Sequence, residues 1–147
     1  MHVFFGLACV ISGLVAMLSA KGRGRHSTFG TIYFWCMGGA FLTMTILSLM
    51  RWAEDYDLFV LGLLAYGFVL CGRLAVTRSW GLRIHATCMG MSYIVLLTAF
   101  YVDNGKNLPL WRDLPSIAYW VIPALVGVPI IVRTLMRHPL LRSPSRI

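Results

Sequence analysis

Two histidines, His26 and His85, are the residues of this sequence whose type and position best suit ligand chemistry. Each follows a short basic stretch and stands at the start of a long apolar run. A helix N-terminus carries partial positive charge, which disfavours imidazolium and keeps an imidazole neutral. Neutral imidazole is the form that binds metal ions, so both side chains are candidate ligands of a metal ion or of haem b.

The two histidines coincide when the sequence is laid on itself with an offset of 59 residues. This register predicts a duplicated two-helix hairpin, with repeat 1 at about residues 3–50 and repeat 2 at about residues 58–105. Eight identities fall within 32 gap-free positions, pairing Val10, Gly13, Ala16, Gly22, His26, Thr28, Ala40 and Phe41 with Val69, Gly72, Ala75, Gly81, His85, Thr87, Ala99 and Phe100.

Residues related by such a duplication are expected at equal depth, so His26 and His85 are predicted to converge on one pocket near the cytoplasmic face. Arg25, Arg73 and Arg83 are predicted to line its rim, where guanidinium groups can pair with haem propionates. A metal or haem iron bridges two rings whose nitrogens lie about 4 Å apart, because each metal–nitrogen bond is about 2 Å. Alternatives are an anion such as a lipid phosphate, a quinone carbonyl, or purely structural histidines that hydrogen-bond a headgroup or a carbonyl.

Composition indicates which kind of scaffold must position these residues. The chain has 147 residues, of which 59% are hydrophobic and 12% charged, and its mean hydropathy is +0.76. A soluble domain has about a quarter charged residues, so this composition is typical of a membrane protein. The prediction is one all-α bundle over residues 1–147, with a fifth helix kinked at Pro123 and Pro129. Its five predicted transmembrane helices span about residues 3–20, 29–50, 58–77, 84–102 and 116–136.

Charge predicts the orientation of the bundle. Ten basic residues fall at one end of the predicted helices, and they are Lys21, Arg23, Arg25, Arg73, Arg78, Arg83, Arg133, Arg137, Arg142 and Arg146. The other end has three, Arg51, Lys106 and Arg112, together with every acidic residue. The positive-inside rule then places the N-terminus outside and the C-terminus in the cytoplasm. Membrane lipids are the expected partners, and nucleic acid is not expected, because no basic run is long enough.

Smaller features complete the expected scaffold. The four cysteines lie inside the predicted spans and are interpreted as small apolar packing residues. Ser27 or Thr28 is expected to cap the second span, and residues 53–57 are expected to form an acidic outer loop. Small residues spaced by four are expected to pair the first span with the second and the third with the fourth, and they are Ser12, Ala16 and Ala20, then Cys71, Ala75 and Ser79.

The second half of the chain carries a longer motif. Ser92-Tyr93 leads through Asp103-Asn104-Gly105 to Leu108-Pro109-Leu110-Trp111, and Tyr119-Trp120 precedes Pro123, Gly127 and Pro129. With His26, Gly30 and Tyr33 in the first half, this pattern resembles a group of small bacterial multi-pass membrane proteins that carry a domain of unknown function. The resemblance covers most of the chain and implies a bacterial plasma-membrane location. It implies no catalytic residues.

Three classes of function remain open. The sequence has no HExxH, Walker or nucleophile-elbow pattern, so hydrolysis and phosphoryl transfer are unsupported, and enzyme activity stays an open question. The first class is a membrane protein that binds haem or another small cofactor between His26 and His85. The second is a non-catalytic accessory subunit packed against other membrane subunits. The third is a small transporter, which is the weakest because the spans have little internal charge.

Overall fold

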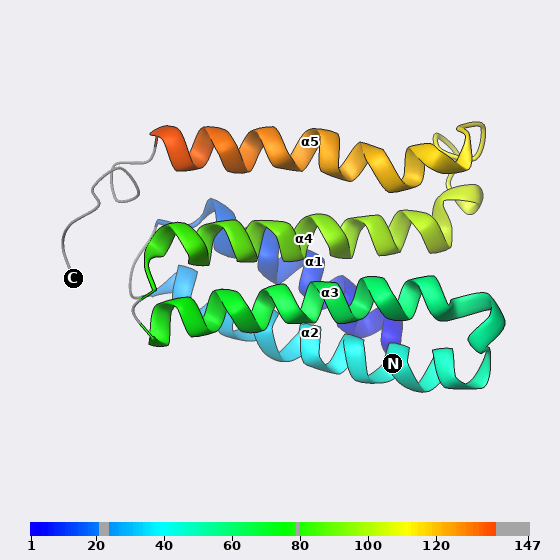
Figure 1. Ribbon diagram of the computed structural model, residues 1–147, viewed down its shortest axis with the longest axis horizontal. Helices are drawn as coiled ribbons and strands as arrows, with labels where there is room; N and C mark the ends of the chain where they lie inside the picture. The colour runs from blue at the N-terminus through cyan, green and yellow to red at the C-terminus, as the bar shows by residue number, and fades with distance from the viewer. Residues whose placement is uncertain (21–23, 79, 138–147) are drawn as a thin grey trace. The chain divides into compact units, whose positions relative to one another are not determined.

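The computed structural model describes residues 1–20, 24–78 and 80–137, and this part of the chain contains helices and no strand. The prediction of an all-α protein is therefore confirmed. Five α-helices and one short 3₁₀ helix follow one another along the chain (Figure 1). They are α1 (His2–Leu18), α2 (Arg25–Met50), α3 (Trp52–Thr77), α4 (Leu82–Asn104), η1 (Gly105–Asn107) and α5 (Ser116–Arg137).

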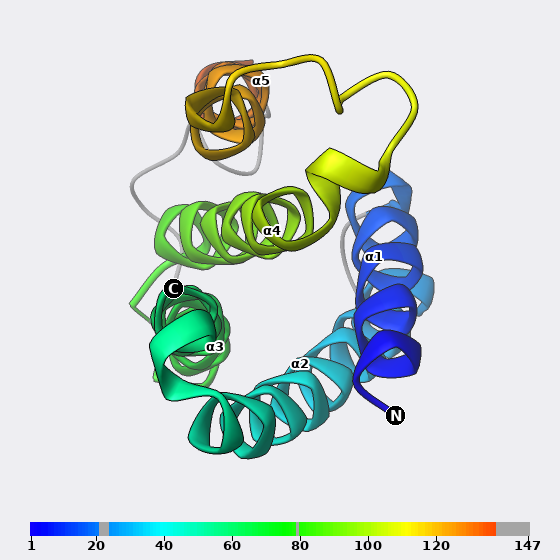
Figure 2. The same cartoon turned by 90° about the vertical axis from the view of Figure 1, so that its right-hand side faces the viewer.

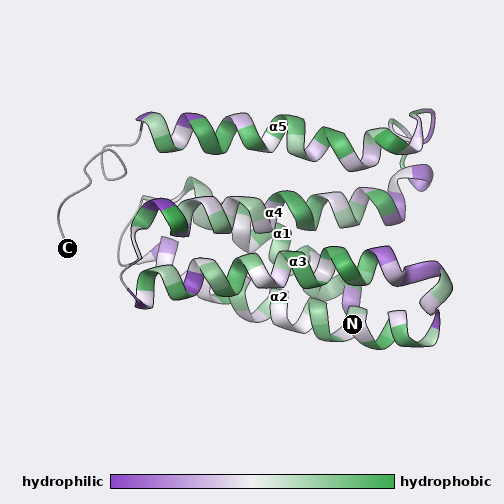
Figure 3. Ribbon diagram, viewed as in Figure 1, coloured by the Kyte–Doolittle hydropathy of each residue, from purple (hydrophilic) through white to green (hydrophobic). Residues whose placement is uncertain are grey.

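Four of these helices, α2 to α5, are long and apolar enough to cross a membrane. The helices are apolar along their middle and polar toward their ends (Figure 3), which is the pattern of helices that meet hydrocarbon in the middle and water at the ends. Helix α1 is apolar but has 17 residues, which is at the lower limit for a spanning helix. The described residues thus contain four candidate membrane spans, which is consistent with a multi-pass membrane protein.

The chain divides into two compact units, Met1–Tyr66 and Gly67–Ile147, with the boundary inside α3. In the first unit α1 packs along α2 (Figure 2). The buried face of α1 is made of small residues, namely Cys9, Ser12, Gly13 and Ala16. A Cβ atom at Gly39 would lie 2.8 Å from the Phe5 ring, so the absent side chain of Gly39 in α2 admits an aromatic side chain of α1. Close packing of this kind associates helices in lipid, where the hydrophobic effect does not.

The turn between α2 and α3 differs from the sequence prediction. Only Arg51 separates the two helices, so residues 53–57 are not a loop but the first turns of α3. Glu54 and Asp55 occupy the first turn, where carboxylates are favoured by the partial positive charge of a helix N-terminus. The Ser48 hydroxyl donates to the Asp55 carbonyl oxygen, and Arg51 forms an ion pair with Glu54. Local capping electrostatics therefore override the loop-like composition of this segment.

In the second unit α5 packs along α4 (Figure 2). Glycines mark the closest approaches: a Cβ at Gly127 would lie 2.4 Å from Ile94 Cγ1, and one at Gly90 would lie 2.7 Å from Ile131 Cδ1. At the end of α4, Gly105 accommodates the Tyr119 ring, whose hydroxyl donates to the Trp111 carbonyl oxygen over 3.0 Å. Pro123 and Pro129 both lie inside α5, as the sequence predicts, while the kink itself stays a prediction.

Charges within each unit follow the predicted asymmetry along the sequence. In the first unit Arg25 begins α2, while Arg51 and the acidic residues lie at its opposite end. In the second unit Lys106 and Arg112 lie between α4 and α5, and Arg133 and Arg137 lie in the last turns of α5. Six residues used in the predictions fall outside the described part of the chain, and they are Lys21, Gly22, Arg23, Ser79, Arg142 and Arg146. The orientation across a membrane stays a prediction.

Candidate functional site

His26 is the second residue of α2 and lies half-buried against α1. Its Nδ1 is 2.8 Å from the carbonyl oxygen of Ala16. Ala16 belongs to the last turn of α1, where carbonyl groups have no partner within the helix. The imidazole therefore caps the C-terminus of α1 and ties the two helices of the first hairpin together.

His85 makes the corresponding contact in the second hairpin. Its Nδ1 is 2.8 Å from the carbonyl oxygen of Gly72 in α3. Gly72 lies five residues before the end of α3, so this carbonyl also belongs to the hydrogen-bond ladder of the helix. The space left by the absent Gly72 side chain is taken by Met89 of α4, whose Sδ would lie 2.9 Å from a Cβ built there.

The two contacts are similar, but the two histidines lie at different positions along their helices. The histidines are 59 residues apart, whereas α2 and α4 begin 57 residues apart, at Arg25 and Leu82. Each helix follows a glycine with positive φ, 122° at Gly24 and 111° at Gly81, and neither start has a side-chain cap. The predicted cap at Ser27 or Thr28 is therefore wrong, because glycine supplies the left-handed backbone that begins the helix one turn earlier. His85 lies about half a turn further into its helix than His26.

These hydrogen bonds define which ring nitrogen carries a proton. A carbonyl oxygen only accepts, so Nδ1 must be the donor in both histidines. In a neutral ring the lone pair then lies on Nε2. Metal-binding histidines commonly have this arrangement, in which one nitrogen donates to a backbone carbonyl and the other binds the metal.

The three arginines predicted at the rim have exposed side chains. Arg25 is adjacent to His26 at the start of α2, and Arg83 lies in the first turn of α4 with His85 two residues later. Arg73 directly follows Gly72, the residue whose carbonyl accepts the His85 hydrogen bond. Each hairpin thus has basic residues close in sequence to its own histidine or to the hydrogen-bond acceptor of that histidine. A single pocket joining His26 and His85 involves both units and stays a prediction.

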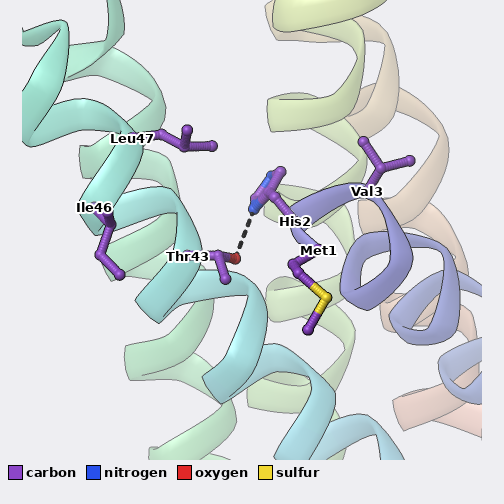
Figure 4. Close-up of a pocket in the computed structure, with 6 residues that line it drawn as sticks. All are labelled: Met1, His2, Val3, Thr43, Ile46 and Leu47. Carbon is purple, nitrogen blue, oxygen red and sulfur yellow. Dashed lines mark hydrogen bonds between the residues drawn. The ribbon is translucent and has the colours of Figure 1, made fainter.

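His2 is a third interhelical histidine, which the sequence patterns do not single out. Its Nδ1 lies 3.1 Å from the Thr43 hydroxyl oxygen and 3.2 Å from the Ala40 carbonyl oxygen. It lines a mostly apolar hollow between α1 and α2 (Figure 4). The hollow is lined by Met1, His2, Val3, Thr43, Ile46 and Leu47. No register match draws attention to His2, because its position in the second repeat is Leu61.

Two cysteines also lie close together, although their spacing in the sequence does not predict a pair. The Sγ atoms of Cys71 in α3 and Cys88 in α4 are 3.3 Å apart. They are separated by 17 residues, and only the hairpin brings them together.

Within residues 1–20, 24–78 and 80–137, no three His, Cys, Asp or Glu side chains gather closely enough to hold a metal ion by themselves.

Comparison with known proteins adds no relative: no family model matches the chain, and neither a curated protein nor a solved structure matches it significantly.

Proposed function

We propose that this chain is a multi-pass membrane protein that binds a small cofactor through His26 and His85, and that this cofactor is haem b. The observation that carries the proposal is the pair of Nδ1–carbonyl hydrogen bonds, both 2.8 Å long, which make Nε2 the nitrogen that bears the lone pair whenever the ring is neutral. With this tautomer His26 and His85 would be the residues that hold a haem iron, each through Nε2. Each ring is oriented by a backbone group of the preceding helix, which reduces the entropy cost of binding.

Charge near the histidines supports haem over a bare metal ion. A haem brings four ligands of its own and two propionates, which need cationic partners near the membrane surface. Arg25, Arg73 and Arg83 have exposed side chains close in sequence to the two histidines or to their hydrogen-bond acceptors. The chemistry that haem would supply is one-electron transfer. The protein would hold the haem through His26 and His85, pair its propionates with the arginines and surround it with apolar side chains.

The setting of the proposal is a bacterial plasma membrane, with the N-terminus outside and the C-terminus in the cytoplasm. Its support is the ten-to-three distribution of basic residues and the resemblance of the span-four motif to small bacterial membrane proteins. Under this topology both histidines belong to the cytoplasmic half of the bundle.

A non-catalytic accessory subunit is the second candidate, and a specific observation favours it. Large apolar side chains in the middle of the helices are widely exposed, including Trp35 at 70% and Leu125 at 65%. Lipid can cover such a surface, and so can another membrane subunit. In this case the hydrogen bonds of His26 and His85 would serve only to hold each hairpin together. A small transporter has no comparable observation in its favour.

The absorbance spectrum of the purified protein distinguishes the two candidates. Protein produced with added haem precursor should show a Soret band of a low-spin haem, at about one haem per chain. His26→Asn and His85→Asn should each lose the haem or convert it to high spin. Asparagine supplies an amide N–H donor for the interhelical hydrogen bond but has no imidazole nitrogen that could bind iron. A folded wild type without a chromophore under these conditions would refute haem binding and favour the accessory subunit.

The topology has its own test. Cysteines introduced at Ser27 and at Asn107, both exposed, should react with a membrane-impermeant maleimide from opposite sides. Intact spheroplasts should label Asn107→Cys, while inverted vesicles should label Ser27→Cys. Labelling of both positions from the same side would contradict the proposed orientation.

A further inference from the structure

We propose that Cys71 and Cys88 form a redox-active dithiol that a lipid-soluble quinone oxidises to an interhelical disulfide. The proposal rests on a side-chain pair in the second unit and is independent of haem binding by His26 and His85. The sequence gives no CxxC spacing, so the pair arises from the hairpin alone.

The positions of the two thiols favour formation of a disulfide. The two sulfur atoms are 3.3 Å apart, both cysteines are free thiols, and they lie on adjacent helices. Disulfide formation brings the sulfur atoms to about 2.05 Å with Cβ atoms about 3.5–4.5 Å apart. The helices already approach closely here, because a Cβ at Gly72, the neighbour of Cys71, would lie 3.4 Å from the Cβ of Cys88. To form the bond, the two sulfur atoms must approach each other by about 1.3 Å.

The surroundings keep this geometry in place. The hydrogen bond from His85 to the Gly72 carbonyl fixes α4 against α3 one helical turn before Cys88. Met89 packs on Gly72 from the same stretch of α4, with its Sδ 2.9 Å from a Cβ built there. The thiols are thus held together by contacts on both sides, rather than meeting by chance at the end of a long side chain.

Position selects the oxidant. Cys71 lies six residues before the end of α3, and Cys88 lies six residues after the start of α4. At a rise of 1.5 Å per residue, each is about 9 Å inside a helix that is apolar enough to cross a membrane. Charged or strongly polar oxidants are excluded from such a depth, whereas quinones dissolve there. Cys88 is 9% exposed, and Cys71 is partly exposed, so Cys71 is the accessible member of the pair.

The reaction is a balanced two-electron exchange. Two S–H bonds break and one S–S bond forms, and the protein loses two electrons and two protons. The quinone takes up both electrons and both protons and becomes a quinol. Return to the dithiol requires a thiol reductant, by exchange through a mixed disulfide at the more accessible sulfur. The disulfide would join α3 and α4 covalently at the level of the His85 contact.

The experiment uses the full-length wild-type protein in lipid nanodiscs. The protein is reduced, freed of reductant and incubated without oxygen with a short-chain ubiquinone. Remaining thiols are then blocked with N-ethylmaleimide, and the peptides are mapped by mass spectrometry. The expected result is a Cys71 to Cys88 disulfide, with Cys9 and Cys36 alkylated and about one quinol formed per chain. Alkylation of both Cys71 and Cys88, or pairing of either with another cysteine, would overturn the proposal.

Variants and a second oxidant sharpen the result. Cys71→Ser and Cys88→Ser should each abolish quinol formation, whereas Cys36→Ser should form as much quinol as the wild type. The water-soluble oxidant diamide, added in place of quinone, tests the oxidant class. A disulfide that forms with diamide and not with quinone would show a close thiol pair whose oxidant is not a quinone, and the proposal would fail. Mapping the wild type needs no variant to fold, so the central result does not depend on the substitutions.

Discussion

Substitution of Gly127 by alanine should lower the free energy of unfolding by about 1–3 kcal/mol, the usual cost of overpacking a close contact. The added Cβ would lie 2.4 Å from Cγ1 and 2.5 Å from Cδ1 of Ile94, distances that packed atoms do not adopt. Ile94 is 5% exposed and β-branched, so it has little freedom to move aside. Leucine at the same position should cost more and should separate α5 from α4. A denaturant titration in detergent micelles measures both effects.

Gly30 provides the matched control for this prediction. It lies in α2, and a Cβ built there has no atom within 4 Å. Gly30→Ala should therefore stabilise the protein by about 0.5–1 kcal/mol, the usual gain when a helical glycine is replaced by alanine. The two alanine substitutions should thus have opposite signs. If Gly127→Ala were neutral or stabilising, the close contact between α4 and α5 would be contradicted.

Gly127 also shows why packing is harder to predict than helix position. The sequence places it between Pro123 and Pro129, which suggests a role in bending α5. The structure gives it a different role, since the space that a side chain at this position would need is occupied by Ile94 of α4. Which residue faces a glycine depends on the pairing and register of two helices. That information is distributed between distant segments and does not appear in the composition of either one.

The positions of the helices were predictable, because twenty apolar residues in sequence have few alternatives to a helix. The sequence predicts that the third span begins near residue 58, whereas α3 begins at Trp52. Hydropathy marks where a helix can meet hydrocarbon and does not mark where the helix itself starts. Glu54 and Asp55 are hydrophilic and also favour a helix N-terminus, so hydropathy assigned them to a loop.

The candidate site was predictable in part. His26 and His85 stand out because the duplicated register pairs them, but nothing in that register identifies Ala16 and Gly72 as their hydrogen-bond acceptors. Those two residues are 56 apart, not 59, since His85 lies further into its helix than His26. The meeting of Cys71 with Cys88 is likewise a product of the hairpin geometry. Residue type indicates what a side chain can do, and tertiary contacts select its partner.

Replacement of His26 by alanine in the cofactor-free protein should cost about 1–3 kcal/mol, and His85→Ala should cost less, about 0.5–1 kcal/mol. The difference follows from the acceptors. His26 donates to the Ala16 carbonyl in the last turn of α1, where the helix supplies no donor. His85 donates to the Gly72 carbonyl inside α3, where the helical hydrogen bond remains after the ring is removed. The free energies of unfolding of both variants, measured in the same micelles, test this order.

Asparagine separates the hydrogen bond from every other property of the ring. Its side-chain amide can donate from about the position of Nδ1, so His26→Asn should recover at least half of the stability lost in His26→Ala. At position 85 the corresponding recovery should be smaller, because less stability is lost. Equal costs for the two alanine variants, or no recovery with asparagine, would mean that the imidazoles contribute through packing rather than through their Nδ1 hydrogen bonds. Haem loss would show a different pattern, with both asparagine variants affected alike, so stability and absorbance together report separately on the two nitrogens of each ring.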